Sequence, residues 1–186
     1  MKFLIYGINY KPELTGIGKY TGEMSEWLAQ HGHDVRVITA PPYYPAWQIE
    51  KGYKNQYTVD VDSGVKVYRC PLYVPNEPTT LTRLLHLISF AFSSFFVLLR
   101  LLFWRPHIVF VVEPTLFCTP MALLYARLTR AKIVLHIQDY EIDAMFGLGL
   151  MSQGVLGRIA KACEKWLMRR FDRVSTISNS MMNLAQ

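Results

Sequence analysis

Residues 2–39, KFLIYGINYKPELTGIGKYTGEMSEWLAQHGHDVRVIT, decide the fold of this protein. Residues 2–8 are a short apolar run followed by turn-forming residues, which is typical of a buried strand. Apolar residues recur at spacings of three and four between residues 18 and 30, and Gly32 lies where a helix C-cap is expected. Residues 34–39 form a second apolar strand. A strand, a helix and a strand in this order predict a right-handed βαβ unit and therefore a parallel sheet.

The rest of the chain continues this alternation. Four further strands are predicted at residues 65–70, 107–112, 132–138 and 173–178, with helices between the last three. The expected fold class is α/β, a Rossmann-like doubly wound parallel sheet. No repeat, linker or low-complexity segment interrupts the 186 residues, so we expect one domain, residues 1–186.

The net charge of +6 leaves two kinds of anionic partner open, nucleic acid and phospholipid headgroups. No zinc-finger, helix-turn-helix or RNA-binding motif is present, so nucleic acid is not an expected partner. The three cysteines have no paired spacing and predict neither a disulfide framework nor a zinc site, as in a reducing cytoplasm. The first apolar run is too short for a secretory signal, and we expect a cytoplasmic protein.

The most apolar segment is residues 81–106. From Leu84 to Trp104 it has 21 residues, of which only His86 and Arg100 can carry a charge. As a helix this stretch could cross a hydrocarbon core about 30 Å thick. It could be a transmembrane helix, a simply buried helix between sheet and solvent, or a helix that dips into one membrane leaflet. A membrane span would divide the predicted sheet, and apolar residues on every face favour the dipping helix.

The densest basic stretch, residues 158–173, has apolar residues at helical spacing. It is either a solvated surface helix or a basic face directed toward membrane lipids.

The loop after the first strand is rich in glycine. Gly16, Gly18 and Gly22 do not have the spacing of a dinucleotide-binding fingerprint, and no acidic residue ends the second strand. Glycine still allows close approach of a ligand to the backbone, and the free N–H groups of the next helix attract anions. A phosphate or diphosphate fits the loop that contains Gly16, Gly18 and Lys19. The alternative is that these glycines only form a turn.

A second group of candidate residues follows the carboxyl ends of the predicted strands, where open α/β sheets bind ligands. Aromatic rings, carboxylates and amides together suit a sugar, because rings stack on its C–H faces and polar groups bind its hydroxyls. His136 and Gln138 share one face of their strand; a strand histidine is often a satisfied core residue, and a functional role is the alternative. The expected crevice contains Tyr43, Tyr44, Trp47, Glu113, Asp139, Glu141 and Asp143. No Ser-His-Asp set or metal-binding motif is found, and no metal site is expected.

Three segments resemble a known family: GINYKPELTGIGKYTGEMSEWLAQHGHDVRVITAPPYYP (7–45), HIQDYEIDAMFGLG (136–149) and FDRVSTISNSM (171–181). They are similar to the N-terminal domain of family-four glycosyltransferases, the N-terminal half of a GT-B fold, and most similar to the colanic-acid-type exopolysaccharide transferases. The resemblance covers essentially the whole chain.

The resemblance implies a retaining hexosyltransferase that moves a sugar from a nucleotide-sugar donor to a saccharide or lipid-linked saccharide on the cytoplasmic face of the inner membrane. It implies that the loop of Gly16 and Gly18 approaches the donor diphosphate, that no metal or other cofactor is needed, and that the domain chiefly binds the acceptor. The apolar helix and the positive charge would seat the protein peripherally on anionic lipid.

Two departures from the family pattern affect these expectations. Many members have His before Asp where this chain has Gln138 before Asp139, so the expected catalytic residues are Asp139, with Gln138 or His136 in place of that histidine. The family also has a C-terminal donor-binding domain, which is absent from this chain, so the chain alone is expected to be inactive. The alternatives are a non-catalytic membrane-surface binding module and an NAD-binding Rossmann domain.

Overall fold

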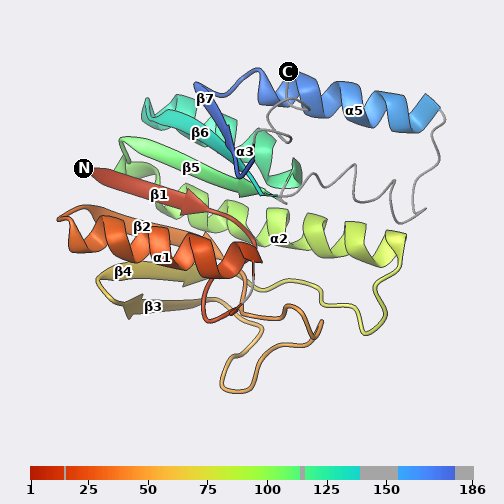
Figure 1. Ribbon diagram of the computed structural model, residues 1–186, viewed down its shortest axis with the longest axis horizontal. Helices are drawn as coiled ribbons and strands as arrows, with labels where there is room; N and C mark the ends of the chain where they lie inside the picture. The colour runs from red at the N-terminus through yellow and green to blue at the C-terminus, as the bar shows by residue number, and fades with distance from the viewer. Residues whose placement is uncertain (15, 114–115, 139–154, 179–186) are drawn as a thin grey trace.

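The computed structural model describes residues 1–14, 16–113, 116–138 and 155–178. Within them a seven-stranded sheet carries helices on both sides (Figure 1). The strands are β1 (Lys2–Tyr6), β2 (Asp34–Thr39), β3 (Thr58–Asp62), β4 (Val65–Arg69), β5 (Ile108–Glu113), β6 (Lys132–Ile137) and β7 (Arg173–Thr176). The helices are α1 (Gly16–Gln30), α2 (Thr80–Arg100), α3 (Thr119–Thr129) and α5 (Val155–Met168), with short 3-10 helices η1 (Leu102–Trp104) and η2 (Leu116–Cys118).

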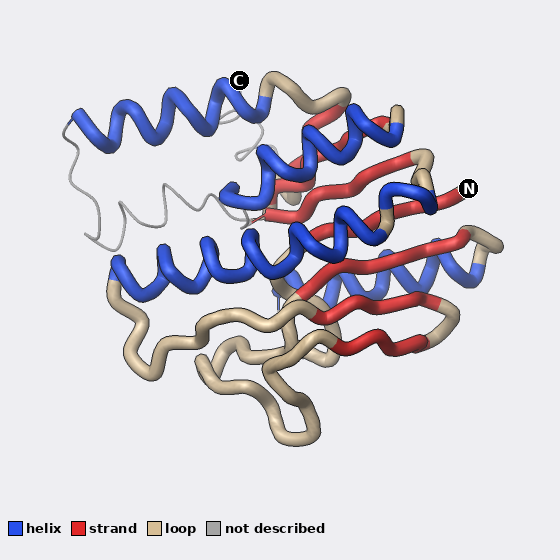
Figure 2. Tube along the Cα trace, turned by 180° about the vertical axis from the view of Figure 1, so that it is seen from behind, coloured by secondary structure: helices blue, strands red, loops and turns tan. Residues whose placement is uncertain are grey.

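The strands lie in the order β3-β4-β2-β1-β5-β6-β7, and every described pair is parallel except β3 with β4. Helix α1 covers one face of the sheet, and α2 and α3 lie side by side on the other (Figures 1 and 2). This is the doubly wound, Rossmann-like α/β fold that the sequence predicts, and the predicted βαβ unit is β1–α1–β2.

The sheet is held by two apolar layers, because alternate residues of a strand point to opposite faces. Leu4 and Tyr6 of β1 belong to the cluster that packs under α2 and α3, whereas Ile5 belongs to the cluster under α1. All three are 0% exposed. The layers fix β1 at the centre, so the loops that follow β1 and its neighbours emerge together at one edge of the sheet.

Strand β3 was not expected from the sequence. It pairs with β4 as an antiparallel hairpin at the edge of the sheet, and four of its five residues are exposed. Ser63 and Gly64 join the strands and both have positive φ, 51° and 81°, as a two-residue type I′ turn requires. An exposed edge strand with two aspartates has no buried face, so no apolar pattern marks it in the sequence.

The predicted apolar helix is shorter than residues 81–106. Helix α2 ends at Arg100, and η1 and Arg105, in a left-handed conformation with φ 49°, follow it. By length and composition α2 could cross a membrane, and 39% of its most apolar window is buried. It packs on the sheet through one face that includes Phe90 and Leu98. The opposite face is exposed, so α2 lies between the sheet and the solvent.

Candidate functional site

The candidate site lies at the edge of the sheet where the parallel strands end. The loops after β1, β2 and β4, residues 7–14, 40–57 and 70–79, gather at this edge next to the start of α1 (Figure 1). Ligands of open α/β sheets bind at this edge, because backbone groups and helix N-termini are free there.

The two glycines at the start of α1 serve different needs. Gly16 has φ +54° and begins the helix, and no heavy atom lies within 4 Å of where a Cβ would be. Gly18 is buried, and a Cβ there would lie 2.8 Å from both Cβ and Oε2 of Glu13. Gly16 therefore satisfies a backbone conformation that L side chains rarely adopt, and Gly18 allows the close contact with Glu13.

Glu13 is a buried carboxylate that joins the glycine loop to the loop after β2. Asn9 Nδ2 donates to its Oε2 at 2.9 Å, and the backbone N–H groups of Tyr43 and Tyr44 donate to its Oε1, each at 3.2 Å. Burial raises the pKa of the Glu13 carboxyl, and these three hydrogen bonds oppose the rise. Glu13 thus fixes the position of the loop after β2, which carries Tyr43 and Tyr44, relative to the start of α1.

Arg69, the last residue of β4, binds the loops that follow β1 and β2. Its guanidinium donates to the carbonyl oxygens of Ala40 at 3.1 Å and Lys11 at 2.9 Å. The side chain stacks on Tyr53, with 4.9 Å between the guanidinium carbon and the ring centroid. Both terminal nitrogens of the buried guanidinium are thus hydrogen-bonded, and Nε lies 3.8 Å from Oδ2 of Asp60, so Arg69 fixes these loops at the edge of the sheet.

The expected aromatic residues form a cluster with a helix residue. Tyr43 and Trp47 pack edge to face at 5.7 Å between ring centroids, and His86 of α2 lies 4.6 Å from Tyr43 and 5.2 Å from Trp47. The Arg83 guanidinium lies 5.4 Å from the Trp47 ring. Tyr44 is 48% exposed and its ring is not part of this set of ring contacts.

His86 is almost completely buried, with a relative exposure of 1%. Its Nδ1 is 2.6 Å from the carbonyl oxygen of Tyr73, and since a carbonyl only accepts, Nδ1 carries the proton. Burial lowers the pKa of His86, so the ring is neutral at pH 7 and Nε2 has a free lone pair. This Nε2 has no hydrogen-bond partner among the described residues.

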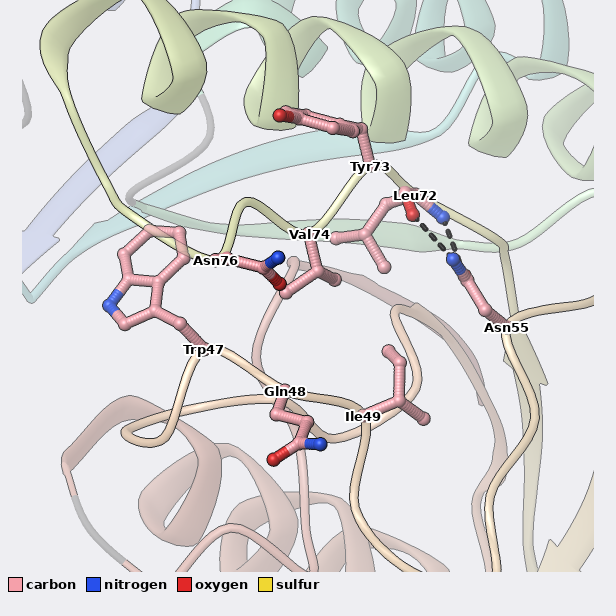
Figure 3. A pocket seen from close by; sticks show the side chains of 8 residues that line it. All are labelled: Trp47, Gln48, Ile49, Asn55, Leu72, Tyr73, Val74 and Asn76. Carbon is pink, nitrogen blue, oxygen red and sulfur yellow. Dashed lines mark hydrogen bonds between the residues drawn. The ribbon is translucent and has the colours of Figure 1, made fainter.

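A groove of about 600 Å³ opens beside the cluster, between the loops after β2 and β4 (Figure 3). Its described lining carries no charged side chain: Trp47, Gln48, Ile49, Asn55, Leu72, Tyr73, Val74 and Asn76. Asn55 exchanges two hydrogen bonds with the backbone of Leu72, at 2.7 and 2.9 Å, and so joins the two loops. Figure 3 draws no hydrogen bond from the Gln48 or Asn76 amide to the other lining residues.

Three other predicted residues, Lys19, His136 and Gln138, do not line the groove. Lys19 is exposed on the first turn of α1, 3.9 Å from Glu23. His136 in β6 is half-buried, with Nδ1 2.9 Å from Ser175 Oγ, and burial lowers its pKa. Gln138 follows β6 directly and is half-buried.

Three of the predicted acidic residues cannot be placed. Asp139, Glu141 and Asp143 lie outside the described residues, and Glu113 is the last residue of β5. His136 contacts Ser175 of β7 and the Phe110 ring, whose centroid is 5.5 Å from that of the imidazole. The catalytic assignments of His136, Gln138 and Asp139 therefore remain predictions.

In residues 1–14, 16–113, 116–138 and 155–178, no group of three or more His, Cys, Asp or Glu side chains is placed to hold a metal ion.

The sequence did not indicate Glu13 or His86 as site residues. Each makes a hydrogen bond to backbone more than twelve residues away in the sequence: Glu13 accepts from the N–H of Tyr43, and His86 donates to the carbonyl oxygen of Tyr73. A weak signal did exist, because a glutamate three residues before Gly16 and a lone histidine in an apolar helix are both unusual places for a buried polar side chain.

The fold and this edge define the chain as a Rossmann-like domain of the kind that forms the N-terminal half of a GT-B fold. The model of the Glycosyl transferase 4-like domain matches residues 15–186, and the chain belongs to this family. The matched residues include Gly16, Gly18, the loop after β2 and the helices α1 and α2.

One curated relative matches over the complete chain. It is the protein of Escherichia coli (strain K12) named "Putative colanic acid biosynthesis glycosyl transferase WcaI", 58% identical over 188 residues. The match covers 100% of this chain and 46% of the relative, so the chain spans about half the length of this relative.

Proposed function

We propose that this chain is the acceptor-binding half of a retaining glycosyltransferase of bacterial exopolysaccharide synthesis. The enzyme would transfer a hexose from a nucleotide-sugar to a lipid-linked saccharide. The observation that carries this proposal is the uncharged groove of aromatic and amide side chains beside the start of α1, in a chain of the Glycosyl transferase 4-like family.

The groove suits the acceptor sugar. An indole such as that of Trp47 offers an apolar surface to the C–H face of a sugar ring, and the amides of Gln48 and Asn76 can both donate to and accept from hydroxyls. The lining has no carboxylate or cation, which supports a neutral sugar ring. The His86 ring lies in the adjoining cluster and packs against Trp47, with 5.2 Å between the ring centroids.

The donor would lie at the start of α1. Gly16 leaves open space over the first turn, and the free N–H groups of the helix favour a diphosphate. Lys19 lies on that turn and can reach an anion as an exposed side chain. We assign no metal or other cofactor to this step. Tyr43, Tyr44, Glu113 and Glu141 are proposed to border the two substrates, with Asp139, Gln138 and His136 at the reacting bond.

The relative named for colanic acid biosynthesis supports the same class of reaction. A lipid-linked acceptor implies that the protein works peripherally on the cytoplasmic face of the inner membrane. A non-catalytic membrane-surface module is the second candidate, and the exposed apolar side of α2 favours it.

The test is a sugar-transfer assay on the product of the complete coding frame, in membranes that contain the lipid-linked acceptor. We expect Asp139→Asn to lower kcat by at least about a hundredfold, the size of a lost general acid or base. Trp47→Ala should raise KM for the acceptor with kcat nearly unchanged, because it removes binding common to the ground and transition states.

Trp27→Ala, which removes an exposed aromatic side chain from the far end of α1, is the matched control and should leave both constants unchanged. Loss of transfer in all three variants, or in none, would contradict the proposed site. Absence of any transfer, with retained binding to membranes, would favour the non-catalytic module.

A further inference from the structure

Helix α2 directs its serines and its histidine inward, among buried apolar residues, and is apolar on its outer side. A surface helix normally directs charged and polar residues to solvent. Here the six residues of the outer stripe are between 43% and 67% exposed and all are apolar: Leu81, Leu85, Ile88, Phe92, Phe96 and Leu99. Spacings of four, three, four, four and three place them in one line along the helix.

The polar side chains of α2 are used inside the domain. Ser94 is 0% exposed, and its Oγ is 2.6 Å from the hydroxyl of Tyr6 in the central strand. His86 donates to the backbone of Tyr73, as described above. The inner side is therefore bound to this domain through specific hydrogen bonds, and α2 cannot turn its apolar stripe inward without breaking them.

The neighbouring helix carries a second stripe of the same kind. Helix α3 lies beside α2 on the same face of the sheet (Figure 2). Its exposed apolar residues, together with one in η2, again follow spacings of four, three and four: Phe117, Met121, Leu124 and Leu128. Phe103 in η1, 92% exposed, continues the line of α2. We call these eleven side chains the apolar face.

Arginines gather at one end of the apolar face. Helices α2 and α3 run in the same direction, so their C-terminal ends lie on the same side of the domain (Figure 2). Arg100, Arg105, Arg127 and Arg130 are exposed at these ends, and the described residues give none of them an ion pair. Residues 80–106 and 116–131 contain no aspartate or glutamate. No carboxylate of these two segments therefore balances the four arginines.

We propose that the apolar face docks on an anionic lipid bilayer, with α2 and α3 lying in the interface and the four arginines on the phosphates. Flat docking buries an apolar stripe at the boundary of headgroups and acyl chains, and arginines beside it reach anionic headgroups. Helices α2 and α3 together form the apolar face, whereas the sequence indicated only the apolar segment that contains α2.

Charge and packing argue against two other occupants. A second copy of the chain would bring the same unbalanced arginines and no carboxylate from these helices to meet them. A transmembrane α2 would lose the buried contacts of Ser94 and His86 and leave their polar groups in hydrocarbon.

Docking would also place the proposed acceptor groove beside the bilayer. Arg83 and His86 in the first two turns of α2 contact Trp47 of the groove. The helix that lies on lipid is thus the helix that supports the groove, which would suit a lipid-linked acceptor. Only this last step rests on the proposed function, because docking itself requires no sugar transfer.

The test is flotation of the purified chain with vesicles of phosphatidylcholine, with and without phosphatidylglycerol. We expect the chain to float with the anionic vesicles and to be released as salt is raised. The double variant Phe92→Gln and Phe96→Gln should bind at least about tenfold more weakly, since two large apolar side chains lose their burial. The double variant Arg127→Gln and Arg130→Gln should bind about tenfold more weakly to anionic vesicles only.

The matched control is the double variant Tyr20→Gln and Trp27→Gln on α1, whose two aromatic rings are 58% and 56% exposed on the other face of the sheet. It should bind like the original chain, and thermal unfolding should show that all variants are folded. Equal binding of the Phe92 and Phe96 variant would overturn the proposal. A dimer in solution that this variant dissociates, with no flotation of the original chain, would overturn it in favour of a second copy.

Discussion

Helices α1 and α2 cover opposite faces of the same sheet and differ in what they present outside. The exposed residues of α1 include Lys19, Glu23 and Gln30 beside two aromatic residues, Tyr20 and Trp27, so its outer side mixes charged, polar and aromatic side chains. The outer stripe of α2 contains no polar residue, and its serines and histidine point into the domain. One sheet thus has a side suited to water and a side suited to an apolar partner.

The largest expected effect compares the two sides of α2 itself. Phe90 is 0% exposed and Phe92 is 67% exposed, two residues apart on one helix. Phe90→Ala should destabilise the domain by about 3–5 kcal/mol, because it leaves a cavity in the core. Phe92→Ala should change stability by no more than about 0.5 kcal/mol. Urea unfolding measures both. A similar cost for the two substitutions would mean that the outer stripe is covered within the domain.

A smaller effect is expected at the start of α1. Gly18→Ala places a Cβ 2.8 Å from Glu13, and overpacking of this kind costs about 1–3 kcal/mol. At Gly16 there is open space and the cost comes only from the positive φ, about 1–2 kcal/mol for alanine.

Substitution by asparagine distinguishes the two causes, positive φ at Gly16 and close contact at Gly18, in the same unfolding experiment. It tolerates the left-handed conformation, so Gly16→Asn should recover most of the lost stability, whereas Gly18→Asn should remain as unstable as Gly18→Ala or worse. Equal recovery at both positions would contradict the contact with Glu13.

The smallest effect is a pH dependence from the inner side of α2. Burial lowers the pKa of His86 in the folded protein, so the unfolded chain binds a proton more readily. Stability should therefore be complete above pH 6.5 and fall as the pH drops below 6.5, by at most about 1.4 kcal/mol per pH unit for one proton. His86→Asn should reduce this slope, and His136, whose pKa burial also lowers, should account for part of the remainder.

His31→Asn, at the exposed C-terminal end of α1, is the control for this pH series. An unchanged slope in the His86 variant would show that the ring is protonated equally in both states.

The sequence predicts those parts of the fold that rest on local patterns. The central βαβ unit follows from residues 2–39, and Gly32, with φ +78°, lies just after α1 as predicted. Strand β3 could have been found only from its turn, because Ser63 and Gly64 are typical of a hairpin whereas Val59 and Val61 are exposed.

The candidate site could be predicted only in part. The aromatic residues Tyr43 and Trp47 were expected at the edge and do meet there. Glu13 and His86 were not expected, because their hydrogen-bond partners come from distant loops that only the tertiary fold brings near. The sequence of α2 shows apolar residues on every side, and only packing decides which side the sheet takes.

Spin labelling of the two helices tests the central comparison most directly. A nitroxide would be attached at position 92 on α2 or at position 23 on α1, after replacement of Cys163, the exposed member of the three free cysteines. On addition of anionic vesicles, the label at 92 should gain contact with dissolved oxygen and lose contact with a water-soluble relaxation agent, while the label at 23 stays in water. An unchanged label at 92, or the same change at 23, would contradict the account.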